Sequence, residues 1–149
     1  MRAVVQRVSR CRVESMGGVR AEVGAGLLVY LGVAADDQQR DIEYVADKIV
    51  HLRIFEDQDH KMNRDVLQTG GSVVVVSQFT LYGDTRKGRR PSYNRAAGAV
   101  EAERIYRGLI DRLAGYGVDV GSGVFQAHMD VVSVNDGPVT ILVDSRKEF

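Results

Sequence analysis

The chain has 149 residues, of which 44% are hydrophobic and 27% are charged, and its 20 basic residues balance 20 acidic ones. These proportions exclude disordered and fibrous classes, and no apolar run approaches the ~20 residues of a membrane-spanning helix. A chain of this length supports one hydrophobic core, so we expect a single domain over residues 1–149.

The first 33 residues predict strands. Residues 3–8 mix apolar and polar side chains at short period, as strands do. Two further extended runs follow over residues 11–33, and the Gly17-Gly18 pair between them suits a hairpin turn because glycine tolerates positive φ. The second run ends in residues 27–33, which are almost wholly apolar and predict a buried strand.

Two segments have the 3.6-residue periodicity of amphipathic helices. The first covers about residues 38–52 behind acidic residues suited to a helix start, and the second ends at Gly115 and Gly117. The apolar faces consist of Ile42, Val45, Ile49 and Leu52 in the first helix and Ala102, Ile105, Leu109 and Leu113 in the second.

The other segments predict strands joined by polar connections. Residues 52–57 and 72–81 are typical of strands, and residues 57–71 form a polar connection between them. The tail predicts at least two strands around residues 135–138. Strands therefore outnumber helices, and we expect an α/β (α+β) domain with both helices on one face of a mixed sheet.

The strand over residues 72–81 begins with four valines and then becomes polar. In an extended chain Gln78 and Thr80 point one way, while Ser77, Phe79 and Leu81 point the other. A strand end that exposes N–H groups beside hydroxyl and amide side chains can hold the oxyanion of an acyl-transfer reaction. The alternative is that Ser77 and Thr80 only end the strand by bonding to nearby backbone.

Two other segments, residues 135–138 and residues 86–95, are further candidates. Residues 135–138, Asn-Asp-Gly-Pro, are ordinary turn material, but a cis Gly137-Pro138 bond would aim its carbonyls rigidly into a pocket. Residues 86–95 hold a cluster of cations with no acid among them, followed by Tyr93, whose ring can stack on a base. Such a run is either a solvated face or a nucleic-acid contact, and its members are Arg86, Lys87, Arg89, Arg90 and Arg95.

The sequence lacks the patterns of metal and cofactor sites. The three histidines, His51, His60 and His128, stand in no zinc-binding spacing and are expected at the surface. Glycine-rich stretches lack the lysine of a phosphate-binding loop, so we expect neither a metal nor a cofactor. The single cysteine, Cys11, forms no disulfide within the chain, and the N-terminus does not have the pattern of a secretory signal. A reducing cytoplasm is the expected location.

Two stretches resemble the hallmark motifs of the D-aminoacyl-tRNA deacylases, also called D-tyrosyl-tRNA deacylases. These motifs are SQFTL, present in "VVVVSQFTL", and a Gly-cis-Pro within NxGPxT, present in "VNDGPVT" about fifty-five residues later. The resemblance spans the whole chain, because "EVGAGLLVYLGV", "LRIFED", "KMNRDV" and "GVFQAHMDVVSV" follow in the family's order. It implies a three-layer α/β/β domain.

The resemblance implies a carboxylic ester hydrolase that cleaves a D-amino acid, or glycine, from the terminal adenosine of tRNA. L-aminoacyl-tRNA is rejected, which makes the reaction a chiral proofreading step in translation. The family also implies a homodimer in which Gly137-Pro138 of one subunit enters the active site of the other. Fixed main-chain atoms form a rigid wall against an L side chain, and glycine has no side chain to reject.

The resemblance also assigns residues. In the catalytic motif the amides of Phe79 and Thr80 hold the oxyanion, while Ser77 and Gln78 position the amino-acid end. The substrate is further bounded by Arg7, which clamps the Gly137-Pro138 element, by Phe125 near the adenosine, and by Met129. The tRNA contacts fall to Arg86, Lys87, Arg89 and Arg90.

Two mechanisms and two rival functions stay open. Thr80 acts as a nucleophile, or the terminal ribose 2′-OH assists a water; we favour the second because no base stands beside the threonine. The rivals are a non-catalytic tRNA-binding module, for which SQFTL is only architecture, and a metal-dependent hydrolase. Release of the free D-amino acid and activity in a chelator separate these possibilities.

Overall fold

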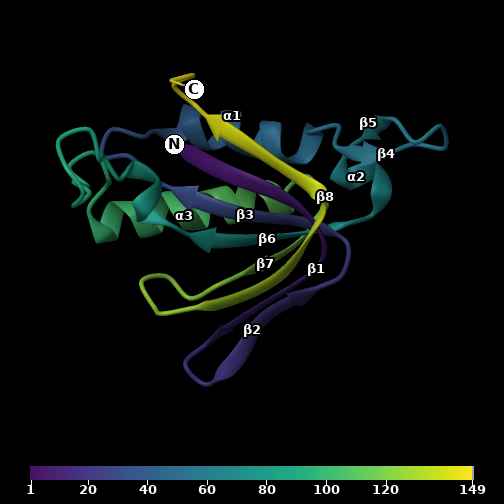
Figure 1. The fold of residues 1–149 in the computed structure, drawn as a ribbon, viewed down its shortest axis with the longest axis horizontal. Helices are drawn as coiled ribbons and strands as arrows, with labels where there is room; N and C mark the ends of the chain where they lie inside the picture. Colours follow the sequence, from purple (N-terminus) through teal and green to yellow (C-terminus); the bar gives the residue numbers. More distant parts are fainter. Residues whose placement is uncertain (149) are drawn as a thin grey trace.

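The computed structural model describes residues 1–148, which form a curled mixed sheet with helices on one side (Figure 1). The strands are β1 (Arg2–Ser15), β2 (Gly18–Val23), β3 (Gly26–Gly32), β4 (Phe55–Glu56), β5 (Met62–Arg64), β6 (Ser72–Ser77), β7 (Asp119–Ser122) and β8 (Asp130–Asp144). The helices are α1 (Gln39–His51), α2 (Val66–Thr69) and α3 (Ala99–Ala114), with a 3₁₀ turn η1 (Phe79–Tyr82).

The long strand β1 organises the sheet. Its first half pairs with β3 and its second half with β2, while β8 runs antiparallel along its other edge. Beyond β3 the order continues through β6 to β7, and both of these pairings are parallel. The β1–β2 hairpin turns at Met16 and Gly17, both at positive φ, as the glycine pair predicted. The two strands curl away from the helices at the lower end of Figure 1.

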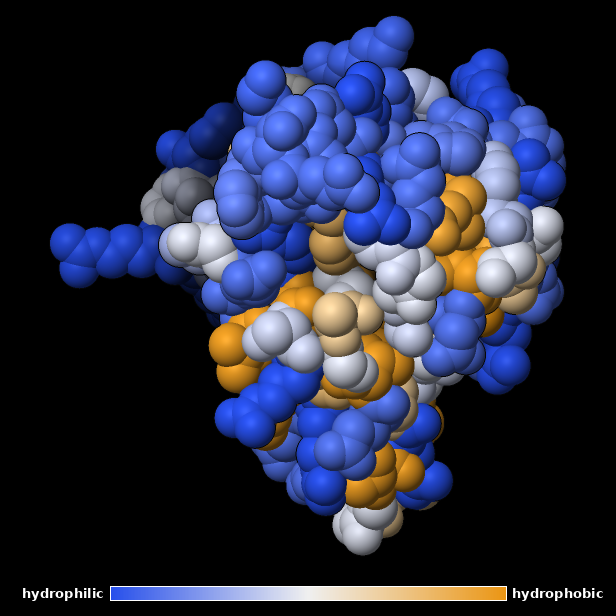
Figure 2. Space-filling view, turned by 90° about the vertical axis from the view of Figure 1, so that its right-hand side faces the viewer, coloured by the Kyte–Doolittle hydropathy of each residue, from blue (hydrophilic) through white to orange (hydrophobic). Residues whose placement is uncertain are grey.

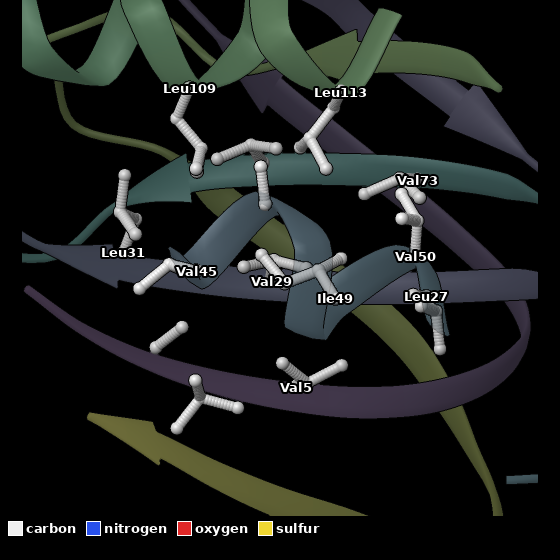
Figure 3. Packing of buried hydrophobic residues seen from close by; sticks show 14 of the residues in the cluster. Val5, Leu27, Val29, Leu31, Val45, Ile49, Val50, Val73, Leu109 and Leu113 are labelled. Atoms are coloured by element: carbon white, nitrogen blue, oxygen red, sulfur yellow. The ribbon is translucent and has the colours of Figure 1, made fainter. Parts of the chain in front are cut away.

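Helices α1 and α3 cover one face of the sheet, as predicted. Figure 3 shows their aliphatic side chains pointing at those of β1, β3 and β6, and the labelled residues are fully or almost fully buried. A second, smaller cluster fills the inside of the curl. Its members are Val8, Cys11, Val13, Ala21, Leu28, Val74 and Val76. Strand β6 therefore has buried side chains on both faces, which explains its uninterrupted valines.

A short helix, α2, lies inside the segment predicted as a polar connection. The Asp65 carboxylate accepts from the Gln68 amide at 2.9 Å, and the Gln68 side chain accepts from the Asp65 N–H at 3.0 Å. This reciprocal capping box stabilises the turn, and Gly70 ends it at positive φ. Four residues are too few to show a helical period, so the pattern was not visible in the sequence. No helix of the described residues is long and apolar enough to span a membrane.

The tail differs from the predicted pair of strands. The chain does not turn back at residues 135–138; β8 runs through them as one strand, and its pairing with β1 shifts register there. Gln6 lies opposite Thr140 and Val8 opposite Asn135, so four residues of β8 bulge outward opposite Arg7. Turn-forming residues build a bulge here because β1 continues on both sides of it and keeps the strand paired.

Candidate functional site

Strand β6 ends earlier than predicted, and its end forms the candidate site. The last ladder pair joins Leu31 to Ser77, and the Gln78 amide donates to the Leu31 carbonyl at 2.7 Å. Residues 79–82 then form the 3₁₀ turn, so the predicted strand to Leu81 is wrong. On the other edge of β6, strand β7 pairs only as far as Val75. The backbone bonds of residues 81 and 83 lie within the 3₁₀ turn.

The turn changes how the motif residues face one another. The side chains of Ser77, Gln78 and Thr80 do not alternate between two faces as they would in a strand. The Gln78 side-chain amide nevertheless donates a hydrogen bond to the Thr80 hydroxyl. In a 3₁₀ turn each N–H bonds three residues back, as Leu81 to Gln78 and Gly83 to Thr80 do. The amides of Phe79 and Thr80 open the turn and have no acceptor inside it. Both residues are exposed, and we therefore expect their two adjacent N–H groups to be open to a ligand.

A cavity of about 370 Å³ opens beside this turn. It lies between the end of β6, the start of α3 and the loop from Gly123 to Met129. Of the predicted site residues it brings together Ser77, Gln78, Phe79, Phe125 and Met129. Small side chains from the α3 side leave the cavity open, and these are Ala97, Ala99 and Ala102. Thr80 does not line the cavity, so the turn borders this largely apolar, partly aromatic pocket through Phe79.

Tyr106 closes the inner wall of the cavity and was not predicted. It is 3% exposed, its hydroxyl donates to the Val75 carbonyl at 2.8 Å, and its ring lies 5.7 Å from that of Phe125. Burial raises the pKa of this hydroxyl to about 12, although the Ser122 side chain and the Gly123 backbone oppose the shift. In the sequence Tyr106 sits on the core-facing side of a helix, so nothing distinguishes it from a packing residue.

The Gly137-Pro138 element lies on the bulge of β8, and its peptide bond is cis. Asn135 closes the bulge, since its side-chain amide donates to the carbonyls of Arg7 and Val139, both at 2.9 Å. Arg7 is buried against the bulge, pairing with the Asp136 carboxylate at 2.9 Å and donating to the Ile54 carbonyl at 2.6 Å. Gly137 and Pro138 are exposed and do not line the cavity of their own chain within the described residues.

The basic loop projects beside the 3₁₀ turn. Asp84 and Ser92 close its stem through two backbone hydrogen bonds of 2.8 and 3.0 Å. Arg86 pairs with the Asp84 carboxylate at 2.6 Å, which holds the pKa of that carboxyl well below its usual range. The other three cations of the loop, Lys87, Arg89 and Arg90, are exposed. Tyr93 follows the stem, and its ring meets the Phe79 ring edge-on at 5.0 Å between centroids.

Among residues 1–148 no three His, Cys, Asp or Glu side chains gather in a way that could hold a metal ion. His51 and His60 lie beside carboxylates at the surface, at 3.4 Å from Asp65 and 3.2 Å from Glu56 respectively. His128 lines the cavity but is 90% exposed and lies 3.5 Å from Asp130. No histidine contact to the Thr80 hydroxyl occurs among the described residues, so this hydroxyl lacks a base.

The family model described as D-Tyr-tRNA(Tyr) deacylase matches residues 4–144. The D-aminoacyl-tRNA deacylases of Symbiobacterium thermophilum and Alkaliphilus metalliredigens are 53% and 54% identical over all 149 residues, covering 99% and 100% of those relatives.

Two solved structures have the same fold. One, named c-Myc DNA Unwinding Element Binding Protein, is 36% identical with a TM-score of 0.91, and the match covers 97% of this chain and 98% of that one. The other is titled a probable eukaryotic D-amino acid tRNA deacylase. It is 16% identical with a TM-score of 0.82, covering 95% and 97% of the two chains, which is a likeness of fold alone.

Proposed function

The chain belongs to the D-Tyr-tRNA(Tyr) deacylase family and is a hydrolase of aminoacyl-tRNA, and from this premise we propose that it is a chiral proofreading enzyme. It cleaves the ester of D-aminoacyl-tRNA and of mischarged glycyl-tRNA and leaves L-aminoacyl-tRNA intact. The observation that carries the proposal is the 3₁₀ turn that begins with the amides of Phe79 and Thr80 and whose first residue, Phe79, lines the cavity. Its expected location is the cytoplasm, where aminoacyl-tRNA is used.

In the proposed reaction the two amides bind the ester carbonyl oxygen. Water attacks the carbonyl carbon, and the N–H groups of Phe79 and Thr80 hold the oxyanion that forms. The 2′-OH of the terminal ribose takes a proton from the water and passes one to the departing 3′-oxygen. The ester C–O bond then breaks and releases the amino acid and tRNA. Ser77 and Gln78 hold the amino-acid end, and Phe125 and Met129 bound the adenosine.

Thr80 is the less suitable nucleophile. Its hydroxyl accepts a hydrogen bond from the Gln78 side-chain amide, and an amide does not take a proton from an alcohol at neutral pH. The contact instead directs a lone pair of Thr80 toward Gln78 and orders both side chains. We therefore propose that Thr80 contributes its main-chain N–H and a wall of the site.

Chiral selection is proposed to need a second copy of the chain. Gly137 and Pro138 lie outside the cavity of their own subunit, so they reach a site only if they enter that of a partner. The outer face of β8 suits a contact between copies, because three large apolar side chains, Val132, Val134 and Leu142, are 59%, 41% and 57% exposed. Figure 2, viewed from the right-hand side of Figure 1, shows hydrophobic residues reaching the surface among polar ones.

A deacylation assay on matched D-tyrosyl-, L-tyrosyl- and glycyl-tRNA tests the proposal. We expect rapid release from the D and glycyl substrates and no release above the buffer rate from the L substrate. Activity should persist in excess chelator, because the described residues offer no metal cluster. Equal release of D- and L-tyrosine would contradict chiral selection, and loss of activity in the chelator would favour the metal-dependent rival.

The basic loop is proposed to hold the tRNA backbone. Replacing both Arg89 and Arg90 by alanine should weaken binding of all tRNAs alike. The slope of the logarithm of the binding constant against the logarithm of the salt concentration should become shallower by roughly 2, about one unit for each lost phosphate contact. Binding measured from 50 to 300 mM salt checks this. Arg104→Ala together with Arg107→Ala removes the same charge from α3, where both cations pair with neighbouring glutamates, and should leave the slope unchanged. An unaltered slope in the loop variant would place the tRNA elsewhere.

A second candidate is a nucleic-acid-binding module without catalysis. The exposed cations of the basic loop favour it, and so does the name of the 36% identical structure, which describes that protein as binding a DNA unwinding element. Duplex DNA and uncharged tRNA offered in the same binding assay separate the two. Tight DNA binding with no deacylation would support the module, whereas turnover of D-tyrosyl-tRNA supports the enzyme.

A further inference from the structure

We propose that Tyr106 is a positioning residue of the site, setting the distance between the strand end that carries Ser77 and the loop that carries Phe125. This inference rests on the proposed function, because it concerns how the same cavity is kept open for the terminal adenosine. Tyr106 itself touches no reacting atom in the proposed reaction. It acts through the two walls that it joins.

The first contact of Tyr106 is with strand β6. Its hydroxyl donates to the Val75 carbonyl at 2.8 Å, two residues before Ser77. The same carbonyl accepts the Gly123 amide at 3.2 Å, at the point where the chain leaves β7. One buried oxygen thus ties together helix α3, the end of β6 and the start of the loop bearing Phe125. A carbonyl has two lone pairs, so both bonds are satisfied at once.

The second contact is with the loop itself. The rings of Tyr106 and Phe125 lie 5.7 Å apart at an interplanar angle of 40°, and both line the cavity. The loop contains no helix or strand between β7 and β8, and its far end is held by the Ser15 hydroxyl, which donates to the His128 carbonyl at 2.8 Å. Ring packing from α3 therefore limits how far Phe125 can move into or away from the cavity.

Close packing in the same loop makes the spacing sensitive. The Met129 sulfur approaches Gly123 so closely that a Cβ built on the glycine would lie 2.3 Å from it. A small displacement of Gly123 away from Val75 would therefore move Met129, which lines the cavity, as well as Phe125. The tyrosine hydroxyl is the group that holds this junction from the helix side.

Tyr106→Phe isolates the hydroxyl, because it keeps the ring against Phe125 and removes the bond to Val75 together with the hydroxyl's interactions with the Ser122 side chain and the Gly123 backbone. The net contribution of one such hydrogen bond corresponds to about a fivefold change in an equilibrium constant. We expect the KM for D-tyrosyl-tRNA to rise about fivefold with little change in kcat, since the proposed oxyanion donors lie on the other side of Ser77. The dissociation constant of a non-hydrolysable amide-linked D-tyrosyl adenosine should rise by the same factor.

Leu109→Val is the matched control. Leu109 lies on the same helix, is fully buried in the core and does not line the cavity. Its truncation lowers stability by an amount comparable to the lost hydrogen bond. The two variants are compared when their melting temperatures are equally lowered. If KM then rises equally in both, Tyr106 contributes only to stability and the proposal is overturned. A rise confined to Tyr106→Phe supports it.

A double-mutant cycle with Phe125→Leu asks whether the effect passes through the loop. If Tyr106 acts by holding Phe125, its substitution should change ligand affinity less in the Phe125→Leu background than in the wild type. Strict additivity would overturn the proposed route. Wild-type assays separate this inference from the function on which it rests: inactive wild type toward D-tyrosyl-tRNA contradicts the function, whereas active wild type with unaltered Tyr106→Phe affinity contradicts the inference alone.

Discussion

A tRNA whose terminal adenosine lacks the 2′-OH should be deacylated at least about 100-fold more slowly, the lower range of a general acid–base contribution. The reason is the composition of the site: residues 77–80 supply donors but no group that accepts a proton from water. The substrate must then provide the proton relay. Single-turnover release of D-tyrosine from a 3′-linked 2′-deoxy substrate measures this.

The control places the deoxy substitution one nucleotide away. A 2′-deoxy group at the penultimate nucleotide removes a hydroxyl without touching the ester, and the rate should then stay near that of the unmodified tRNA. Thr80→Ala completes the comparison. Since only the side chain is lost, we expect most single-turnover activity to remain. Full-speed cleavage of the 2′-deoxy substrate, with loss of activity in Thr80→Ala, would restore the threonine as nucleophile.

Arg7→Ala should both destabilise the fold and weaken the discrimination between D and L substrates. Arg7 is 7% exposed and joins two segments of the chain, because it contacts the Ile54 carbonyl and the Asp136 carboxylate. Its removal leaves a buried carbonyl without its donor, which costs about 2 kcal/mol of the free energy of unfolding. Asp136 adds less, because its side chain is half exposed and can be solvated.

The effect on selectivity follows from the same contacts. Without Arg7 the bulge at residues 136–139 loses the group packed beneath Gly137 and is free to shift. The ratio of D- to L-tyrosyl-tRNA deacylation rates should fall about tenfold or more, the range that one lost steric contact can supply. Arg7→Lys keeps the charge but not the two-pronged geometry and should recover only part of the ratio.

Arg12→Ala is the matched control on the same strand. Arg12 is 44% exposed and pairs with Glu14, so its loss should change neither stability nor selectivity beyond the small value of a surface ion pair. Thermal unfolding and paired D and L assays on the three variants check these expectations. A D-to-L ratio that stays at the wild-type value in Arg7→Ala, despite lowered stability, would exclude the clamp.

Much of the scaffold could be predicted from local pattern. Helix α1 lies within one residue of the predicted bounds at each end, because Ile42, Val45 and Ile49 recur at helical spacing. The hairpin at Gly17 needed positive φ, which glycine signals directly. The valines of β6 indicated an apolar strand, and the structure shows it buried on both faces. Each of these features depends on residues close together in the chain.

The shape of the site was decided by contacts between distant segments. Whether residues 78–81 continue a strand depends on a partner, and β7 pairs only as far as Val75, so the chain turns and leaves two amides open. Whether Asn-Asp-Gly-Pro reverses the chain depends on β1, which stays paired on both sides and makes a bulge instead. In the sequence Tyr106 resembles an ordinary packing residue, and only the fold places its hydroxyl against the Val75 carbonyl. The sequence by itself determined which residues carry hydrogen-bonding groups and apolar faces, whereas tertiary pairing alone decided where those groups are left free, because a donor is free only when no neighbouring strand or turn takes it.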